Sequence, residues 1–144
     1  MPVDWSGTPR LANPMKTLIV DDDLTSRLVL RRMLTPYGEC QVTATGEEAI
    51  TAFEAARAAN DAYGLVCLDI MLPGIGGLAT LARIRAIEQA DRVPAEQRAR
   101  VIMTTGVTDR ASVAAAIAKQ CDGYLVKPVS SHDLLKRLQA LSLI

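Results

Sequence analysis

The sequence predicts an α/β fold in which helices cover both faces of a parallel sheet. From Lys16 onward, short apolar runs rich in branched residues alternate with longer segments of helical period, which is the pattern of successive strand and helix units. The runs 17–20 and 65–68 are apolar without alternation, as expected for strands buried on both faces. A length of 144 residues corresponds to one domain that can bury a proper core.

Five strand candidates can be counted along this part of the chain. A helical segment follows each of them, so the strands are expected to run parallel. They are residues 17–20, 40–44, 65–68, 101–104 and 124–126.

The first two helices have clear start signals. The first is expected after Asp23, which we assign to helix capping, and it is expected to stop at Gly38. Thr45 and Glu48 have the spacing of a capping box and predict the start of the second helix. Apolar residues at helical spacing form one stripe on the first helix: Val29, Leu30, Met33, Leu34 and Tyr37.

The remaining helices are predicted from similar patterns. The third follows Gly76 and Gly77, and the polar stretch 88–100 then gives a long connection to the fourth strand. Apolar residues of the third helix are Leu78, Leu81 and Ile84.

Two further caps begin the last two helices. Asp109 can open the fourth helix, with Val113 and Ile117 directed inward. Ser130, with Asp133 three residues on, can cap the fifth helix. The apolar residues of this fifth helix are Leu134, Leu135, Leu138 and Leu141.

Composition excludes several functions. The 16 basic and 16 acidic residues give a net charge of zero, which argues against a dedicated nucleic-acid binder or a membrane-surface protein. The longest apolar run, 113–118, is far too short to cross a bilayer, and the N-terminus lacks the pattern of a secretory signal. Cys40, Cys67 and Cys121 are widely spaced, which indicates reduced thiols in a cytoplasmic protein and no zinc site.

The first 15 residues differ from the rest. Residues 1–15 hold three of the seven prolines and show no helical or strand period, so we expect a flexible tail before a domain at 16–144. Alternatively, Trp5 and Leu11 dock on the domain.

Polar side chains close four of the five strands. The first ends in the run Asp21, Asp22 and Asp23, the third in Asp69, the fourth in Thr104 and Thr105, and the fifth in Lys127. In an open parallel sheet, ligands bind beyond the carboxyl ends of the strands, where these groups would meet.

This set of residues suits a phosphoryl group and a divalent cation. Two carboxylates about 4 Å apart repel by about 4 kcal/mol at an effective dielectric constant of about 20, so clustered aspartates need a counter-charge. Oxygen ligands without Cys or His favour Mg²⁺. The lysine and a threonine hydroxyl can bind phosphoryl oxygens, which leaves Asp69 as a natural nucleophile.

Four motifs in this order resemble the receiver domain of two-component response regulators. They are LIVDDD at 18–23, LDIMLPG at 68–74, VIMTTG at 101–106 and GYLVKP at 123–128. The resemblance covers residues 16–144 and is to stand-alone, chemotaxis-regulator-like receivers, since no output domain follows Ile144.

The resemblance implies both a fold and a function. The fold would be the flavodoxin-like receiver fold, a doubly wound five-stranded parallel sheet in the order 2-1-3-4-5 with five helices. The function would be that of a phosphorelay switch and not of an enzyme. A phosphohistidine on a sensor histidine kinase or a histidine phosphotransfer protein would donate a phosphoryl group to the domain in the presence of Mg²⁺.

The family pattern also implies a role for particular residues. Asp69 would be the phosphoacceptor, Thr105 the switch hydroxyl, Lys127 the ion-pairing lysine, and Tyr124 the aromatic residue whose rotamer follows Thr105. The metal ligands would be Asp22, Asp69 and the backbone carbonyl of Met71, with Asp21 acting through a bound water. A cis peptide bond would precede Pro128.

This chain departs from the family pattern beside the site. Gly76 stands where an acidic or polar residue is common, and Gly106 replaces the usual alanine. Met71 and Val107 occupy positions that tune dephosphorylation in the family, and two apolar side chains there predict a long-lived phosphorylated state. The readout would appear between residues 107 and 141, on a face that binds a downstream protein or a second copy of the chain.

Two alternatives remain open. Residues 21–25 also fit the D-x-D-x-T pattern of haloacid-dehalogenase-like phosphatases, with Asp21 as nucleophile and Asp23 as acid and base. That interpretation leaves the LDIMLPG motif unexplained and lacks a late acidic pair. The other alternative is a pseudo-receiver that binds partners without phosphorylation, which the retained site residues disfavour.

Overall fold

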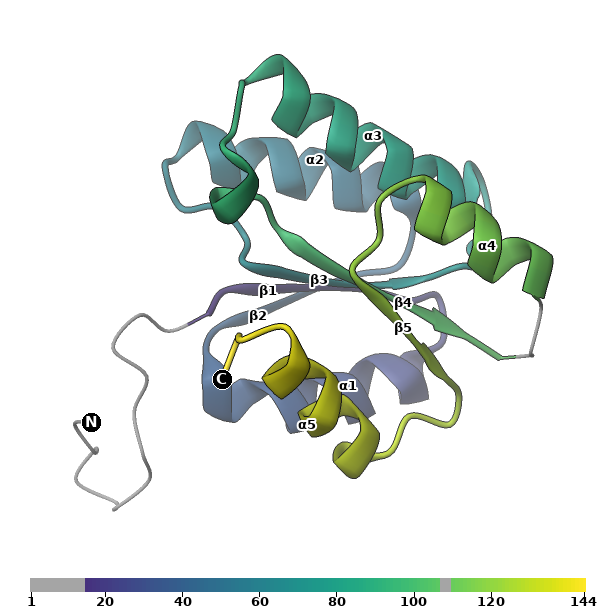
Figure 1. Cartoon of the computed structure of the whole chain (residues 1–144). Helices are drawn as coiled ribbons and strands as arrows, with labels where there is room; N and C mark the ends of the chain where they lie inside the picture. The colour runs from purple at the N-terminus through teal and green to yellow at the C-terminus, as the bar shows by residue number, and fades with distance from the viewer. Residues whose placement is uncertain (1–14, 107–109) are drawn as a thin grey trace, which may run out of the picture.

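A five-stranded parallel sheet lies between two layers of helices in the computed structural model of the chain, which describes residues 15–106 and 110–144 (Figure 1). The strands are β1 (Thr17–Val20), β2 (Cys40–Thr43), β3 (Leu65–Asp69), β4 (Arg100–Thr105) and β5 (Gly123–Val126). The helices are α1 (Leu24–Leu34), α2 (Gly46–Ala58), α3 (Gly76–Ala90), α4 (Arg110–Ala118) and α5 (Ser131–Ala140), and two short 3₁₀ helices cover Thr35–Tyr37 and Ala95–Gln97.

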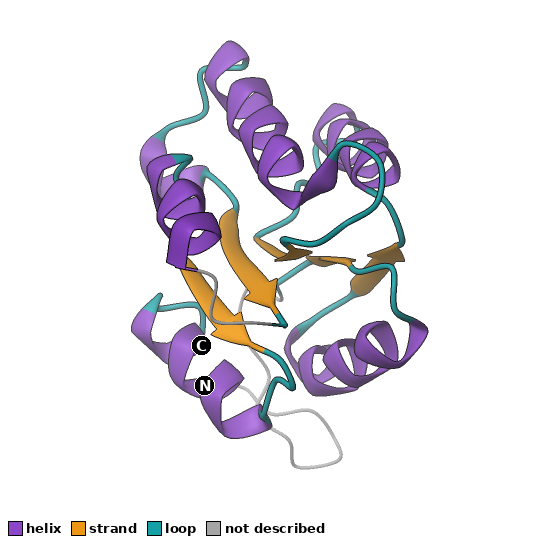
Figure 2. Ribbon diagram, turned by 90° about the vertical axis from the view of Figure 1, so that its right-hand side faces the viewer, coloured by secondary structure: helices purple, strands orange, loops and turns teal. Residues whose placement is uncertain are grey.

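The strand order is β2-β1-β3-β4-β5, and every neighbouring pair is parallel, as expected. Helices α1 and α5 cover one face of the sheet, and α2, α3 and α4 cover the other (Figures 1 and 2). The sheet is therefore doubly wound, and the carboxyl ends of β1, β3, β4 and β5 meet along one edge.

Each face of the sheet has its own hydrophobic core. Side chains alternate between the two faces along a strand, so Leu18 and Val20 pack under α2 and α3, whereas Ile19 packs under α1 and α5. All residues of β1 and β3 are buried, which explains why these two segments are apolar without alternation.

Three of the four predicted caps are present in the described part of the chain. The side chain of Asp23 accepts a hydrogen bond from the backbone N–H of Ser26, and Ser130 accepts one from the backbone N–H of Asp133. Thr45 accepts one from the N–H of Glu48 at the start of α2. The peptide bond between Lys127 and Pro128 is cis, as the resemblance implies.

Several details differ from the predictions. Ile117 is 59% exposed and Val29 is 40% exposed, so neither faces the core. On α4 the buried residue is Ala116, which directly precedes Ile117 in the sequence and therefore lies on a different side of the helix. Asp109, expected to open α4, and Val107 lie outside the described residues.

The boundaries at Met15 and Glu88 also differ. Met15, the last residue of the expected tail, is 7% exposed, and its N–H donates to the carbonyl of Tyr37, so it belongs to the packed domain. Glu88, expected in the polar connection, is 1% exposed and lies in α3. Arg85, one turn earlier, forms an ion pair with Glu88, so a buried charged residue can be part of the helix.

Candidate functional site

Asp21 is the most buried acid at the carboxyl edge of the sheet. The N–H of Asp21 donates to the carbonyl of Thr43 on β2, which extends the sheet pairing by one residue. The Oδ1 atom of Asp21 accepts from the N–H of Asp23 at 2.9 Å. Asp22, the next residue, is exposed. The chain thus turns from β1 into α1 with one carboxylate directed inward and the next toward solvent.

Asp69 ends β3 and is also buried. Its Oδ1 atom accepts a hydrogen bond from the N–H of Met71 at 2.9 Å, which fixes the carboxylate against the loop that follows. Met71 itself is 71% exposed and points away from the core.

Lys127 connects the two buried acids. Its Nζ atom lies 2.7 Å from Asp21 Oδ2 and 3.0 Å from Asp69 Oδ2. Burial lowers the pKa of Lys127, but the hydrogen bonds and charges of Asp21 and Asp69 outweigh that effect and raise the pKa above its ordinary value. Lys127 is therefore a fixed positive charge at neutral pH.

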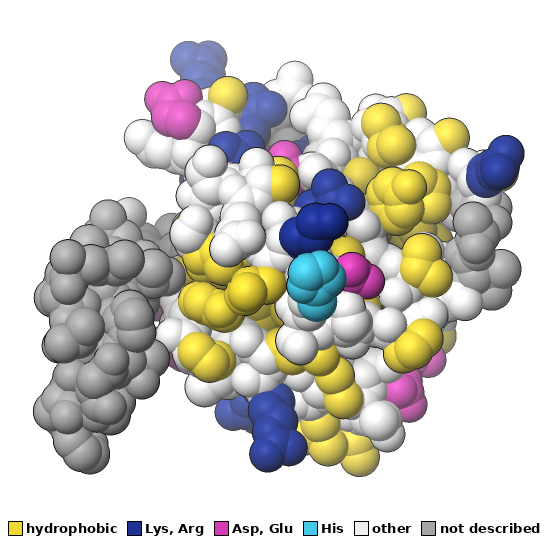
Figure 3. Space-filling view, turned by 60° about the horizontal axis from the view of Figure 1, so that its bottom comes forward, with side chains coloured by type: hydrophobic (Ala, Val, Ile, Leu, Met, Phe, Trp, Pro, Cys, Tyr) yellow, Lys and Arg dark blue, Asp and Glu magenta, His cyan; other side chains and the backbone are white. Residues whose placement is uncertain are grey.

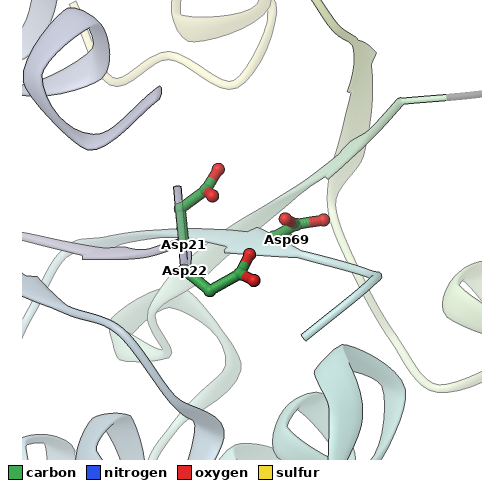
Figure 4. Close-up of side chains that lie close together, drawn as sticks. All are labelled: Asp21, Asp22 and Asp69. Carbon is green, nitrogen blue, oxygen red and sulfur yellow. The ribbon is translucent and has the colours of Figure 1, made fainter. Parts of the chain in front are cut away.

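The three acids form a cluster with metal-binding geometry. One carboxylate oxygen from each of Asp21, Asp22 and Asp69 lies within 4.8 Å of the others (Figure 4). Three carboxylates against one lysine leave a local excess of negative charge. The donors are all hard oxygen atoms, so this set fits a divalent cation such as Mg²⁺.

A cavity of about 420 Å³ opens beside Asp69. It provides space for a small group in contact with the carboxylate, the Lys127 side chain and Thr105. Thr105 ends β4 and is buried, and its carbonyl accepts from the N–H of Lys127 at 2.7 Å. The lining residues are Asp69, Ile70, Met71, Thr105, Gly106, Ser112 and Lys127.

The predicted residues are thus brought together with one exception. Tyr124 is 40% exposed on β5 and lines a groove with Val126 and Lys136. It pairs with Met103 across the sheet and does not line the cavity beside Asp69.

The sequence analysis missed two residues near the site. Arg27 Nη1 donates to the carbonyl of Asp21 at 2.9 Å and brings a second positive charge to this edge. Its position one turn after Asp23 on the first helix was an available signal. Ser112 lines the cavity from α4, and no pattern in the sequence pointed to it.

A model of the response regulator receiver domain family matches residues 17–139. The chain therefore belongs to this family. Receiver domains are the phosphorelay switches of two-component systems, they bind Mg²⁺ at an acidic aspartate cluster, and they interact with histidine kinases or phosphotransfer proteins. The membership favours the receiver interpretation over the phosphatase interpretation with Asp21 as nucleophile.

Relatives in other organisms agree with this assignment. The probable transcriptional regulator ycf27 of Cyanophora paradoxa is 33% identical over 130 residues, which are 90% of this chain and 48% of that protein. The chemotaxis protein CheY of Pseudomonas aeruginosa is 28% identical over 127 residues, 88% of this chain and 95% of CheY. The chain spans about half the length of the curated transcriptional regulators that it matches.

Solved structures show the same fold. A CheY-like receiver domain protein from Methanospirillum hungatei has a TM-score of 0.74 at 25% identity, covering 90% of this chain and 94% of its own. A chain of the CheX–CheY complex with BeF₃ and Mg²⁺ from Borrelia burgdorferi has a TM-score of 0.73 at 26% identity, covering 95% and 92%. No helix in the described part of the chain is both long and apolar enough to span a membrane.

Proposed function

We propose that Asp69 is the phosphoacceptor of this receiver domain. The observation that carries the proposal is the position of its carboxylate, which lies 3.0 Å from Lys127 Nζ, belongs to the acidic cluster, and borders a cavity large enough for a phosphoryl group. Among the clustered acids, Asp69 is the one that lines this cavity together with Thr105.

The reaction moves a phosphoryl group from nitrogen to oxygen. A carboxylate oxygen of Asp69 forms a bond to phosphorus while the P–N bond of a phosphohistidine breaks, and the leaving imidazole nitrogen takes a proton from solvent. The donor is a sensor histidine kinase or a histidine phosphotransfer protein. The free thiols of Cys40, Cys67 and Cys121 support a location in the cytoplasm.

Lys127 and Thr105 would bind the transferred group. Lys127 holds Asp69 in place before transfer, and its ammonium can pair with a phosphoryl oxygen afterwards. The Thr105 hydroxyl borders the same cavity and can donate a hydrogen bond to a second oxygen. In this role the chain assists its own phosphorylation without being an enzyme for another substrate.

The acidic cluster would hold Mg²⁺. The ligands would be Asp22, Asp69 and the backbone carbonyl of Met71, with Asp21 acting through water. When bound, Mg²⁺ offsets the negative charge that Asp69 and the incoming phosphoryl oxygens share. The carboxylate of Asp21 is fixed by Lys127 Nζ and by the N–H of Asp23.

The signal would leave through the face formed by α4, β5 and α5. A phosphoryl group would draw Thr105 toward it and shift the balance between two arrangements of the segment after β4. Tyr124 would follow this shift. Apolar side chains exposed on this face suit a downstream protein or a second copy of the chain: Ile117, Tyr124 and Val126.

Intact-mass spectrometry tests the phosphoacceptor. After incubation with acetyl phosphate or phosphoramidate and Mg²⁺, the protein should gain one phosphoryl group. Asp69→Asn and omission of Mg²⁺ should each abolish the gain. A phosphoryl group mapped to Asp21 would support phosphatase chemistry instead, and no gain in the unaltered protein would favour a pseudo-receiver.

A further inference from the structure

Helix α3 begins without a side-chain cap of its own. Ile75 occupies the N-cap position and makes no side-chain cap hydrogen bond, and the first turn contains no acidic residue. Gly76 stands where the family often has an acidic or polar residue. The free N–H groups and the positive end of the α3 dipole therefore need an acceptor from outside the helix.

Glu47 of α2 supplies this acceptor. Its Oε1 atom accepts a hydrogen bond from the N–H of Ile75 at 3.1 Å, although the two residues are 28 positions apart in the chain. The carboxylate also lies against the backbone of Gly74, where an added Cβ would come within 2.7 Å of Glu47 Oε1. Gly74 has a φ of +75°, so glycine satisfies both the turn and the contact.

Gly46 allows α2 to approach α3 closely enough for this contact. An added Cβ at Gly46 would lie 2.1 Å from Thr80 Oγ1 and 2.9 Å from Ile75 Cγ1. The Thr80 hydroxyl is itself engaged with the carbonyl of Gly76 at 2.7 Å. Gly46 is buried, so the backbone at the start of α2 is held beside Ile75, whereas the side chain of Glu47 and its hydrogen bond to Ile75 are exposed to solvent.

The segment that Glu47 contacts leads out of the phosphorylation site. The inner end of this loop is fixed, since Met71 N–H donates to Asp69 Oδ1 and Gly77 N–H donates to the carbonyl of Ile70 at 3.1 Å. Among the described contacts, Glu47 is the side chain that fixes the outer part at residues 74–75. The backbone carbonyl of Met71 lies on the stretch between these two attachments.

We propose that Glu47 is a positioning residue for the phosphorylation site. By holding the loop at Ile75, it keeps the carbonyl of Met71 where it can complete the Mg²⁺ ligand set. Its carboxylate takes the place of the acidic or polar side chain that the family often has at the position of Gly76. This inference rests on the proposed function, because it assigns Glu47 a role through the Met71 carbonyl.

Hydrogen exchange without metal tests the contact itself. The variants are Glu47→Ala, which removes the acceptor, and Glu47→Gln, which keeps a side-chain carbonyl oxygen but removes the charge. Glu54→Ala is the matched control, because Glu54 is an exposed acid on the same helix with no hydrogen bond to a described residue. The Ile75 amide should exchange faster in Glu47→Ala only.

Titration calorimetry with Mg²⁺ tests the consequence. Loss of one such hydrogen bond should weaken Mg²⁺ binding by about three- to tenfold in Glu47→Ala. Glu47→Gln should remain within about twofold of the unaltered protein. If both variants weaken binding equally, the charge acts at a distance and the positioning role is wrong. It is also wrong if Glu47→Ala matches Glu54→Ala.

A double-mutant cycle with Gly74→Ala provides a second measurement. The added Cβ meets the carboxylate of Glu47, so Gly74→Ala should weaken Mg²⁺ binding less in the Glu47→Ala background than in the unaltered protein. Additive effects would contradict the proposed contact. Failure of the unaltered protein to bind Mg²⁺ or accept a phosphoryl group would instead overturn the proposed function, whatever the exchange of Ile75 shows.

Discussion

Lys127 is the cation that bridges the buried carboxylates of Asp21 and Asp69. The side chain of Asp21 is almost inaccessible, and its Oδ2 atom is 2.7 Å from Lys127 Nζ. A buried carboxylate that loses its partner retains the cost of desolvation without the compensating attraction. The lysine therefore stabilises the fold as well as preparing the site.

Lys127→Met should lower the free energy of unfolding by about 3 kcal/mol in the absence of divalent cations. Urea denaturation at neutral pH measures this change. Because Mg²⁺ supplies a counter-charge to the same acids, it should stabilise the variant more than the unaltered protein. Lys136→Met is the control, since Lys136 is exposed and pairs with no described acid. Equal losses of stability in both variants would contradict the stabilisation of the buried carboxylates by Lys127.

Met71 stands at the mouth of the cavity beside Asp69. As an exposed apolar side chain, it offers no hydrogen bond to an attacking water. Met71→Asn should shorten the lifetime of phosphorylated Asp69, measured by loss of the added mass over time. Met71→Leu should leave the lifetime long, and an unchanged lifetime in the asparagine variant would contradict the idea that this side chain restricts water.

Cys67 is inaccessible in the centre of β3. Burial raises the pKa of its thiol to about 12, so at pH 8 it remains protonated and unreactive. Iodoacetamide should label Cys40 and Cys121 in the folded protein and Cys67 only in urea, as mass spectrometry can show. Labelling of folded Cys67 at the rate of Cys121 would contradict protection of the thiol by burial.

The same shift makes the stability of the fold depend on pH. Between an unfolded pKa near 9 and the folded value, the thiol of Cys67 loses its proton first in the unfolded chain, so the free energy of unfolding falls as pH rises.

At the scale of elements, strands were more predictable than helix faces. The five strands lie within one residue of their predicted ends because a strand buried on both faces must be an apolar run, whatever it packs against. Ile117, expected to point inward, and Val29, expected on the apolar stripe of the first helix, are both exposed. The face that a short helix turns inward depends on its neighbours.

The candidate site was predictable for the same topological reason. Residues that end adjacent parallel strands must meet, so Asp21, Asp69, Thr105 and Lys127 could be grouped from strand positions alone. Arg27 and Glu47 were missed because their contacts, with the carbonyl of Asp21 and with the N–H of Ile75, are made from helices. Their contacts depend on how α1 and α2 pack, and apolar periodicity specifies that orientation only coarsely.

Arg85 joins three elements at the amino end of the sheet. Its guanidinium donates to Glu88 Oε1 on α3, to the carbonyl of Ala99 before β4, and to Asp122 Oδ2 before β5. Glu88 also accepts from the N–H of Ala99 at 2.7 Å. The network fixes the C-terminal end of α3 and the start of both strands.

Arg85→Met should therefore destabilise the domain by about 3–5 kcal/mol, because it leaves Glu88 buried without its cation. Arg83→Met, on an exposed position of the same helix, should change stability by less than about 0.5 kcal/mol. Replacing both Arg85 and Glu88 by Met should recover part of the loss, since the unpaired charge is gone. Chemical denaturation measures these three variants and Glu88→Met, and a doubly substituted protein as unstable as the sum of the changes in Arg85→Met and Glu88→Met would contradict the pairing.

Across the whole molecule, the two ends of the strands differ in charge. At the carboxyl edge, Asp21, Asp22 and Asp69 face one lysine that pairs with two of them, so a cation bound there would lower the electrostatic repulsion. The amino edge, with Arg85 and Glu88, is internally paired. The face formed by α1 and α5 mixes hydrophobic side chains with charged side chains of both signs (Figure 3), and these helices rest on their own core.

Among the described helices, α4 is the one that we expect to move most easily. Its buried residue is a single alanine, Ala116, whereas α2 and α3 each bury larger side chains such as Phe53 and Ile84. Helices with little buried apolar surface open at low free energy. Ser112 on α4 borders the cavity beside Asp69, so the site and the loosely packed helix are in direct contact.

Hydrogen exchange monitored by mass spectrometry should therefore show the fastest exchange among the helices in α4 of the unmodified protein. Adding BeF₃ with Mg²⁺, as a mimic of the phosphoryl group, should change protection in α4 and β5 while leaving α2 unchanged. Asp69→Asn should abolish the change, because the mimic would lose its attachment. Protection that rises equally in every helix would mean that the ligand stabilises the fold uniformly, through linkage alone, and that α4 is not the moving element.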